Sequence, residues 1–332
     1  MIDSLSLQNP HDHFFKILFS DPEKVKSFLQ GALPKPIIAN LNFDTLEIDP
    51  SSYIDQQLQE FFADIVYTCR YKSESQVHLA FLFEHKSYVP QRPHLQLLRY
   101  MLNIWEQRLK EGQTLLPIVP MIIYHGKDRW QIKRMEEYFE REIGDELSPF
   151  LPSFDYVLTN LQEESGNSIR SRFQKLSLQM GFLLMKWVRD ESLLDSMEEI
   201  LEGMESLHPS EQGEIYLEQI FVYLLTATVL NPKIVMDKAR KISHDAGEFA
   251  NTAGMKLIRM GMEKGIEEGR RKGIIEGIQK GKIEGMKSIL NLHISKMLLK
   301  QMDISLISEI TEVSLKEIKA IQAKLKKEGK LK

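Results

Sequence analysis

The sequence predicts a mixed α/β fold, in which a sheet flanked by helices is followed by a helical subdomain and a helical C-terminal tail. Three observations predict it. Two β-prone segments joined by a short polar turn indicate a hairpin over residues 62–86. Apolar residues recur at helical spacing before and after that hairpin, over 12–31 and 96–109. The continuous apolar run over 118–124, flanked by proline and glycine, predicts a buried strand.

The first elements have recognisable boundaries. The helix over 12–31 is expected to break at Asp21-Pro22. Residues 34–55 are expected to be irregular, because three prolines interrupt them. The hairpin strands are predicted over 62–71 and 76–86, since apolar residues alternate with other side chains along the second one.

Apolar and acidic stretches then alternate in a way that predicts helices from about residue 168 to residue 250. We therefore predict four parts: a sheet-containing core over 1–165, a helical subdomain over 166–254, a glycine-rich helical segment over 255–287 and a small helical tail over 288–332. A chain of 332 residues is long enough for one substantial core or two domains.

Composition restricts the class of protein. Hydrophobic residues make up 42% and charged residues 27%, as in ordinary globular proteins, which argues against extensive disorder. One cysteine excludes an intramolecular disulfide and fits a reducing compartment. The N-terminus lacks a basic start followed by an apolar run, and the longest apolar stretch, Ile215 to Leu230, is too short and too polar to span a bilayer. We expect a cytoplasmic protein with no membrane partner.

Charge is distributed unevenly along the chain. Residues 255–332 contain 18 Lys and Arg against 10 Asp and Glu, which is a net charge of +8. Because the whole chain has a net charge of −4, residues 1–254 have a net charge of −12. A basic tail on an acidic body favours contact with a polyanion, of which DNA is the obvious example. A solvated, lysine-rich helical tail is the alternative.

The hairpin places two acids and a lysine together. With the turn centred near residue 74, Asp64 and Glu84 are expected to lie opposite each other across the two strands, and Lys86 shares the face of Glu84. A shift of one residue in the register would separate the two carboxylates. Histidine 85 would point to the opposite face, and no histidine of the chain is assigned a role in the site.

Two opposed carboxylates repel each other unless a cation lies between them. An oxygen-preferring divalent ion such as Mg²⁺ supplies that cation, and Mn²⁺ suits the same ligands. Such an ion polarises a phosphoryl oxygen and lowers the pKa of a water, and Lys86 could orient that water or stabilise negative charge. The chemistry implied is phosphodiester hydrolysis. The alternative is a solvated strand face or a surface ion pair.

At these residues the chain resembles the PD-(D/E)XK nuclease superfamily, and more narrowly the Rpn family of recombination-promoting nucleases, whose members are also described as transposases. Five segments carry the resemblance in the order that the family has them: HDHFFKILFSDP (11–22), FFADIVY (61–67), FLFEHKS (81–87), QLLRYM (96–101) and PIVPMIIYHG (117–126).

The resemblance implies a restriction-endonuclease-like core and assigns roles to residues. Asp64 and Glu84 match the two metal-binding acids and Lys86 matches the catalytic lysine, although Ala63 stands where many members have proline. Gln96 would position the attacking water or a phosphate, with Tyr100 in support. The alternative for Gln96 and Tyr100 is an ordinary i, i+4 pair on a helix.

Asp12 stands where related nucleases often place a further metal-binding acid; alternatively it is the N-cap of its helix. The function expected is metal-dependent DNA endonuclease activity linked to recombination or to mobile or foreign DNA. The second hypothesis is a catalytically inactive DNA-binding or oligomeric component of a transposase-like system.

Seven glycines recur every four residues from Gly261 to Gly285. Each costs a helix about 1 kcal/mol relative to alanine, so a helix that keeps them needs compensating packing. Small residues at this spacing let two helix backbones approach closely. The segment is too charged for a membrane, and we predict a homodimer through Gly261–Gly285. A flexible linker is the alternative.

The tail is predicted to form short helices over 289–301, 304–310 and 315–327, with Ser305 and Ser314 as N-caps. The last two resemble a helix-turn-helix, which would place its second helix in the DNA major groove. A helical hairpin that binds nothing is the alternative.

Overall fold

The structure is a computed structural model that describes residues 9–49, 65–72, 78–139, 146–207 and 210–331. The chain separates into two compact units, Met1–Ile258 and Arg259–Lys332, each of which is described by itself. The division into four parts stays a prediction.

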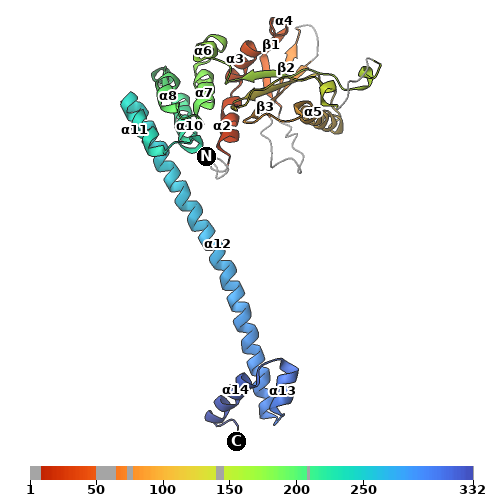
Figure 1. Ribbon diagram of the computed structural model, residues 1–332, viewed down its shortest axis with the longest axis vertical. Coiled ribbons are helices and arrows are strands. Elements are labelled where there is room, and N and C mark those ends of the chain that lie inside the picture. Colours follow the sequence, from red (N-terminus) through yellow and green to blue (C-terminus); the bar gives the residue numbers. More distant parts are fainter. Residues whose placement is uncertain (1–8, 50–64, 73–77, 140–145, 208–209, 332) are drawn as a thin grey trace. The chain divides into compact units, whose positions relative to one another are not determined.

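In the described part of the first unit, five strands form one mixed sheet in the order β1-β2-β3-β4-β5 (Figure 1). β1, β2 and β3 pair in antiparallel fashion, whereas β3, β4 and β5 are parallel. The parallel strands therefore have their carboxyl ends at one edge of the sheet, where the loops that follow them meet. The strands are β1 (Leu41–Ile48), β2 (Ile65–Tyr71), β3 (His78–Lys86), β4 (Ile118–Tyr124) and β5 (Val157–Asn160).

Helices cover both faces of the sheet, as the sequence predicts. One face packs against α2 and α3, which join the later helices, and the other packs against α5 (Figure 1). The helices of this unit are α2 (Pro10–Phe19), α3 (Pro22–Ala32), α4 (Lys35–Ile38), α5 (Pro93–Lys110), α6 (Gly166–Arg172), α7 (Leu176–Trp187), α8 (Leu193–Leu201), α9 (Met204–Leu207), α10 (Glu211–Ala227) and α11 (Pro232–Ile242). Two 3₁₀ helices, η1 (Met135–Tyr138) and η2 (Ser148–Phe150), lie between β4 and β5.

Alternation along the strands divides the apolar residues between two cores. Tyr67 and Phe81 belong to the larger core with Phe15 of α2, and the helices α6 to α11 extend that core. Val66 and Ile122 belong to the smaller core beneath α5. Successive side chains of a strand point to opposite faces, so these residues identify the face on which every other strand position lies.

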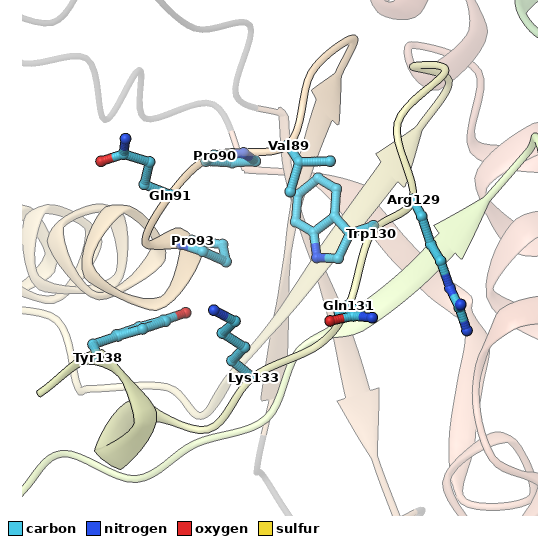
Figure 2. Close-up of a pocket in the computed structure, with 9 residues that line it drawn as sticks. All are labelled: Val89, Pro90, Gln91, Pro93, Arg129, Trp130, Gln131, Lys133 and Tyr138. Atoms are coloured by element: carbon cyan, nitrogen blue, oxygen red, sulfur yellow. The ribbon is translucent and has the colours of Figure 1, made fainter. Parts of the chain in front are cut away.

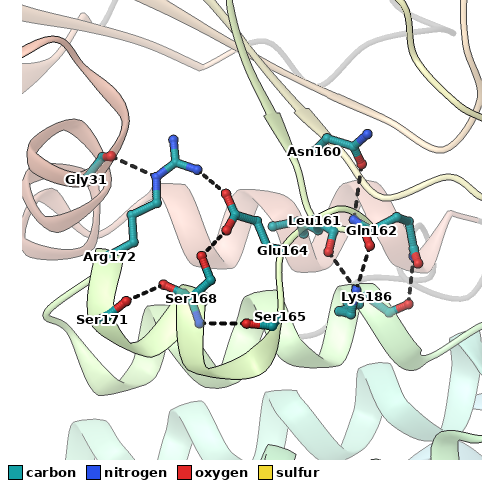
Figure 3. A network of polar contacts seen from close by, with 10 residues as sticks. All are labelled: Gly31, Asn160, Leu161, Gln162, Glu164, Ser165, Ser168, Ser171, Arg172 and Lys186. Carbon is teal, nitrogen blue, oxygen red and sulfur yellow. Dashed lines mark hydrogen bonds and ion pairs between the residues drawn. The ribbon is translucent and has the colours of Figure 1, made fainter.

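A polar network fixes the end of β5 to the helices on the larger core (Figure 3). Lys186 of α7 is buried and its Nζ donates to the carbonyl oxygens of Leu161 and Gln162, each at 3.0 Å. Arg172 of α6 donates through Nε to the carbonyl oxygen of Gly31 in α3 at 2.8 Å. Satisfied buried hydrogen bonds of this kind hold the segment after β5 in one position.

Most predicted elements of this unit are present, and one prediction was wrong. The break at Asp21 is confirmed, since its side chain caps α3 by accepting from the backbone N of Glu23 at 3.0 Å. The prediction of irregular structure over 34–55 was wrong, because Leu41–Ile48 forms β1 at the edge of the sheet. The prolines stand outside β1, and an apolar residue at every second or third position suits a half-exposed edge strand.

The second unit has its own small core, built from α12 (His244–Leu299), which begins in the first unit, and from α13 (Ile304–Thr311) and α14 (Leu315–Lys327). Its buried residues are Ile294, Leu298, Ile307, Ile318 and Leu325. The helix predicted over 289–301 is the end of α12, and the glycine repeat lies within the same continuous helix.

The helix caps of the tail differ in part from the prediction. Ser314 caps α14, as predicted, and its Oγ accepts from the backbone N of Glu317. The prediction of Ser305 as the cap of α13 was wrong, because Asp303 fills that position and accepts from the backbone N of Ser305 and Leu306. Within the described residues, no helix combines the length and the apolar character that crossing a bilayer requires.

Candidate active site

The hairpin of β2 and β3 has the register that the sequence predicts. In each described pair, from Ile65 with Phe83 to Arg70 with His78, the two residue numbers add up to 148. Asp64 and Glu84 have the same sum, but Asp64 lies outside the described residues. The opposition of the two acids therefore stays a prediction, made from a register that the described pairs share.

Strand β3 also fixes which face the predicted site occupies. β3 aligns with β4 in parallel, Glu84 with Ile122 and Lys86 with Tyr124. Aligned residues of neighbouring strands share a face, and Ile122 and Tyr124 belong to the core beneath α5. Positions 84 and 86 therefore lie on the α5 face, at the carboxyl end of β3.

Lys86 is only 3% exposed. Its Nζ lies 5.9 Å from the centroid of the Tyr88 ring, and its backbone oxygen accepts from the backbone N of His125 at 3.0 Å. Lysine is almost never fully buried without a group that compensates its charge. A buried lysine at a strand end, two positions after a glutamate, is the arrangement that the predicted chemistry needs.

Helix α5 brings two further predicted residues to the same face. Gln96 and Tyr100 lie one turn apart, and Gln96 Nε2 donates to the hydroxyl of Tyr100 at 2.9 Å. Tyr100 is buried in the core that also holds Ile122 and Tyr124. The contact is that of the i, i+4 pair, and a role for Gln96 in positioning water stays a prediction.

Asp12 approaches the sheet from the other face. It is not the N-cap of α2, because Asn9 occupies that position and donates through its side chain to Asp12. Asp12 forms a hydrogen bond with Nε2 of His85, which aligns with Ile123 of the larger core. The structure thus joins Asp12 to His85 rather than to Lys86, and its role as a metal ligand stays a prediction.

The charge state of Asp12 follows from that contact. Burial by itself would raise the pKa of Asp12, but the hydrogen bond and charge of His85, helped by Lys16, outweigh it and hold the pKa below its usual value. Asp12 is therefore ionised at neutral pH.

Three histidines, to which the sequence assigns no role, gather beside Asp12. The ring centroids of His11 and His125 lie 5.1 Å apart and those of His85 and His125 lie 5.8 Å apart. Nδ1 of His11 shares a hydrogen bond of 2.8 Å with the hydroxyl of Tyr223. The alternation of β3 predicts correctly that His85 faces away from Glu84, but the meeting with α2 and α10 depends on packing that no local pattern reveals.

Two of these histidines, His11 and His125, are neutral at physiological pH. Burial, followed by the charges of Arg189 and His85, lowers the pKa of His11 to about 3. Burial also lowers the pKa of His125 well below its usual value, and both of its ring nitrogens lack a hydrogen-bond partner among the described residues. The histidine cluster is therefore a set of buried polar side chains within the larger core.

The donor atoms of the predicted site suit a hard divalent cation, because carboxylate oxygens are the ligands that Mg²⁺ and Mn²⁺ prefer. Among the residues that the structure describes, no three His, Cys, Asp or Glu side chains gather in an arrangement that could hold a metal ion. The predicted set includes Asp64, which stands outside those residues.

A pocket of about 320 Å³ opens at the carboxyl ends of β3 and β4 (Figure 2). The loop after β3, the first turn of α5, the loop after β4 and η1 form its walls. No local sequence pattern marked it, because the segments that line it are distant along the chain. The lining residues are Val89, Pro90, Gln91, Pro93, Arg129, Trp130, Gln131, Lys133 and Tyr138.

Comparison with curated proteins identifies relatives that carry nuclease names. The chain is 24% identical over 221 residues to the inactive recombination-promoting nuclease-like protein RpnE of Escherichia coli K12, covering 65% of this chain and 70% of RpnE. It is 31% identical over 118 residues to the recombination-promoting nuclease RpnA of the same strain, covering 35% of this chain and 40% of RpnA.

The recombination-promoting nuclease RpnD of Escherichia coli O157:H7 is 24% identical over 140 residues, with 41% of this chain and 54% of RpnD covered. The chain thus spans about half of the length of RpnA and RpnD. No solved structure matches it. The family model described as "Putative transposase, YhgA-like" matches residues 9–214, which is more than half of the chain. The protein therefore belongs to the Rpn family of YhgA-like transposases and recombination-promoting nucleases.

Proposed function

We propose that this protein is a Mg²⁺-dependent endonuclease that hydrolyses phosphodiester bonds in DNA, and that its sheet and flanking helices form a PD-(D/E)XK core. Asp64 and Glu84 hold the metal ion, Lys86 assists the attacking water, and Gln96 positions that water with Tyr100 behind it. Asp12 is a further candidate ligand from the opposite side of β3. Mn²⁺ suits the same donors.

The single observation that carries the proposal is the burial of Lys86 on the face of β3 that also holds position 84. Placing an ammonium group there is costly for stability unless an anion compensates it. An anionic phosphate in front of Lys86 and the acids at positions 64 and 84 supply that compensation. The names of RpnA and RpnD support nuclease chemistry in the family.

The residues divide the chemistry between them. A bound Mg²⁺ would neutralise the phosphate and lower the pKa of the attacking water. Lys86 stabilises the negative charge that develops on the phosphoryl oxygens, or takes part in moving the proton of the water. Gln96 accepts from the water through its carbonyl oxygen, because its Nε2 is engaged with Tyr100.

Cleavage of supercoiled plasmid by the purified full chain tests the proposal. We expect nicking with Mg²⁺ or Mn²⁺, none with EDTA, and none by Glu84→Ala under any of these conditions. Glu106→Ala is the matched control, since Glu106 lies on the last turns of α5, away from the end of the helix that holds Gln96. The control is expected to cut like the unaltered protein.

Absence of cleavage by the unaltered protein with either metal would replace this proposal by the second one. That proposal is a DNA-binding or oligomeric component without catalysis, and one observation favours it: RpnE, a relative that matches 65% of this chain, carries the description inactive. DNA binding that survives in EDTA and in Glu84→Ala would then be the activity of the protein.

We further propose that the protein acts as a homodimer joined through Gly261–Gly285. The seven glycines lie in α12, and a methyl group at any of them would meet no atom of the described residues within 4 Å, apart from its own neighbours in the helix. Large apolar side chains alternate with them and are exposed, among them Ile266 at 72% and Ile278 at 66%. A second copy that covers this face would account for both the glycines and the exposed apolar residues.

A further inference from the structure

The pocket at the carboxyl ends of β3 and β4 adjoins the candidate active site. Its wall includes Val89, three residues after Lys86 in the loop that follows β3. It also includes Pro93, which begins α5 one turn before Gln96. A ligand in the pocket would therefore lie beside the group that the site acts on.

The apolar walls of the pocket are held rigidly from behind. Trp130 is 5% exposed, and its Nε1 donates to the hydroxyl of Tyr156 at 3.0 Å. The ring of Tyr156 packs at 5.1 Å from that of His94, and His94 shares a hydrogen bond of 2.7 Å with the hydroxyl of Tyr138. This chain of contacts fixes the indole and phenol walls relative to α5, so the pocket is formed before anything binds.

The charged groups of the pocket are both cationic. Arg129 and Lys133 are the charged residues that line it, and both are exposed at its rim, while Gln91 and Gln131 add amide groups (Figure 2). Flat apolar walls with cations at the rim suit a ligand that carries a planar ring and a phosphate. A volume of about 320 Å³ lies at the lower end of the range for small-molecule sites, which begins near ~300 Å³.

We propose that this pocket takes one unpaired nucleotide of a DNA strand, with the base against Val89, Pro93 and Trp130 and the phosphates on Arg129 and Lys133. The inference rests on the proposed function for the nature of the polymer. A paired base is enclosed in the stack of a duplex, so a concave site of this kind admits a base only from single-stranded or locally opened DNA. The protein would accordingly prefer substrates with unpaired nucleotides.

Binding in EDTA separates this inference from catalysis. Fluorescence anisotropy of the full chain would compare a labelled single-stranded oligodeoxynucleotide with a blunt duplex of the same sequence. The variant is Arg129→Ala with Lys133→Ala. Both side chains are exposed, so folding is expected to be unaffected. The matched control is Lys35→Ala with Lys233→Ala, two exposed lysines of the same unit that do not line the pocket.

We expect the pocket variant to bind the single strand about tenfold more weakly, with the slope of log affinity against log salt reduced by about 1.4, the value for two phosphate contacts on a single strand. Its affinity for the duplex and the affinities of the control should change little. Fluorescence of a Trp105→Phe, Trp187→Phe protein, in which Trp130 is the remaining tryptophan, should be quenched by the single strand and not by the duplex.

Three outcomes would overturn the inference. If the pocket variant lost the same affinity for the single strand and for the duplex, Arg129 and Lys133 would be general contacts to the DNA backbone. If the pocket variant bound the single strand as tightly as the unaltered protein does, the pocket would have no part in DNA binding. Quenching of Trp130 by free deoxyadenosine monophosphate, without any effect of the variant on the oligonucleotide, would assign the pocket to a free nucleotide. If the unaltered protein binds single strands through the pocket but cuts no DNA, the proposed function fails and the pocket assignment stands.

Discussion

At the residue scale, Lys86 and Lys24 are two buried lysines with different surroundings. Lys86 is 3% and Lys24 is 6% exposed. The ammonium of Lys24 lies 3.9 Å from the centroid of the Tyr216 ring and 3.8 Å from a carboxylate oxygen of Asp21. Burial lowers the pKa of Lys24 to about 8, which the charge of Asp21 opposes. Lys24 therefore has a structural setting, whereas Lys86 stands at the end of a strand beside the candidate site.

This difference predicts that the same substitution lowers the rate of DNA cleavage when it is made at Lys86 and leaves the rate unchanged when it is made at Lys24. Lys86→Met should lower the rate of plasmid cleavage by about 10²- to 10⁴-fold, the usual contribution of a proton-transfer group. The rate is to be measured per folded molecule, because removing one charge from a buried group of charges also changes stability. Lys24→Met is the matched control and should lose stability while cleavage per folded molecule is kept. A Lys86→Met protein that cuts DNA normally would contradict the role of Lys86.

The buried histidines give a prediction about pH. In the unfolded chain the imidazoles of His11 and His125 have a pKa near 6.5, whereas burial holds the pKa of His11 at about 3 and that of His125 well below its usual value. The unfolded state therefore binds more protons once the pH falls below about 6.5. Stability should be undiminished above that pH and should decline below it, by up to about 1.4 kcal/mol per pH unit for each histidine.

His125→Leu should make this decline shallower, because it removes one of the two groups and leaves no polar ring atoms without partners. The free energy of unfolding in urea, followed by circular dichroism at about pH 7.5 and about pH 5.5, measures the effect. His244→Leu is the control, since the side chain of His244 is 86% exposed. A decline that is the same in unaltered and His125→Leu protein would show that other groups cause it.

At the element scale, success of the sequence predictions depended on the length and regularity of the apolar pattern. The run from Ile118 to Tyr124 is apolar throughout and is bounded by breakers, and β4 has those same bounds. β5 has four residues, too few to show an apolar pattern. It is a strand because its backbone pairs with that of β4. Local sequence cannot report a strand that neighbouring backbone creates.

The N-cap of α13 was also not predictable from local sequence, and its identity can be tested. Both Asp303 and Ser305 are good capping residue types, and the structure uses Asp303 for α13. Asp303→Ala should destabilise α13 by about 1 kcal/mol, while Ser305→Ala should have little effect, since its side chain caps nothing. Hydrogen exchange of the α13 amides in the full chain would measure both. Faster exchange in Ser305→Ala than in Asp303→Ala would show that the cap is misassigned.

At the scale of the whole molecule, the candidate site was predictable where it depends on one hairpin and not where it depends on packing. The alternation of β3 and the position of the turn were enough to place Glu84 and Lys86 on one face in the observed register. The partnership of Asp12 with His85 and the pocket around Trp130 join segments that are distant in sequence. Their positions follow from how the helices cover the sheet, which residue spacing does not encode.

The glycine repeat of α12 is the feature whose explanation lies beyond a single chain. Seven glycines together should weaken the helix by several kcal/mol, at about 1 kcal/mol each, and no described residue outside the adjoining turns of α12 packs against them. In a helix that stands alone, Gly273→Ala with Gly277→Ala should therefore stabilise the protein. If a second copy packs on the glycines, the two added methyl groups would separate the backbones, and the substitution should weaken self-association instead.

Sedimentation equilibrium of the full chain distinguishes these opposite results. We expect a dimer whose dissociation constant rises at least about tenfold in Gly273→Ala with Gly277→Ala, which corresponds to ~1.4 kcal/mol. Glu276→Ala, an exposed change on the same turns, is the control and should leave the dimer intact. A monomeric unaltered protein whose helix content increases with the two alanines would rule out the homodimer and leave α12 as a solvent-exposed helix.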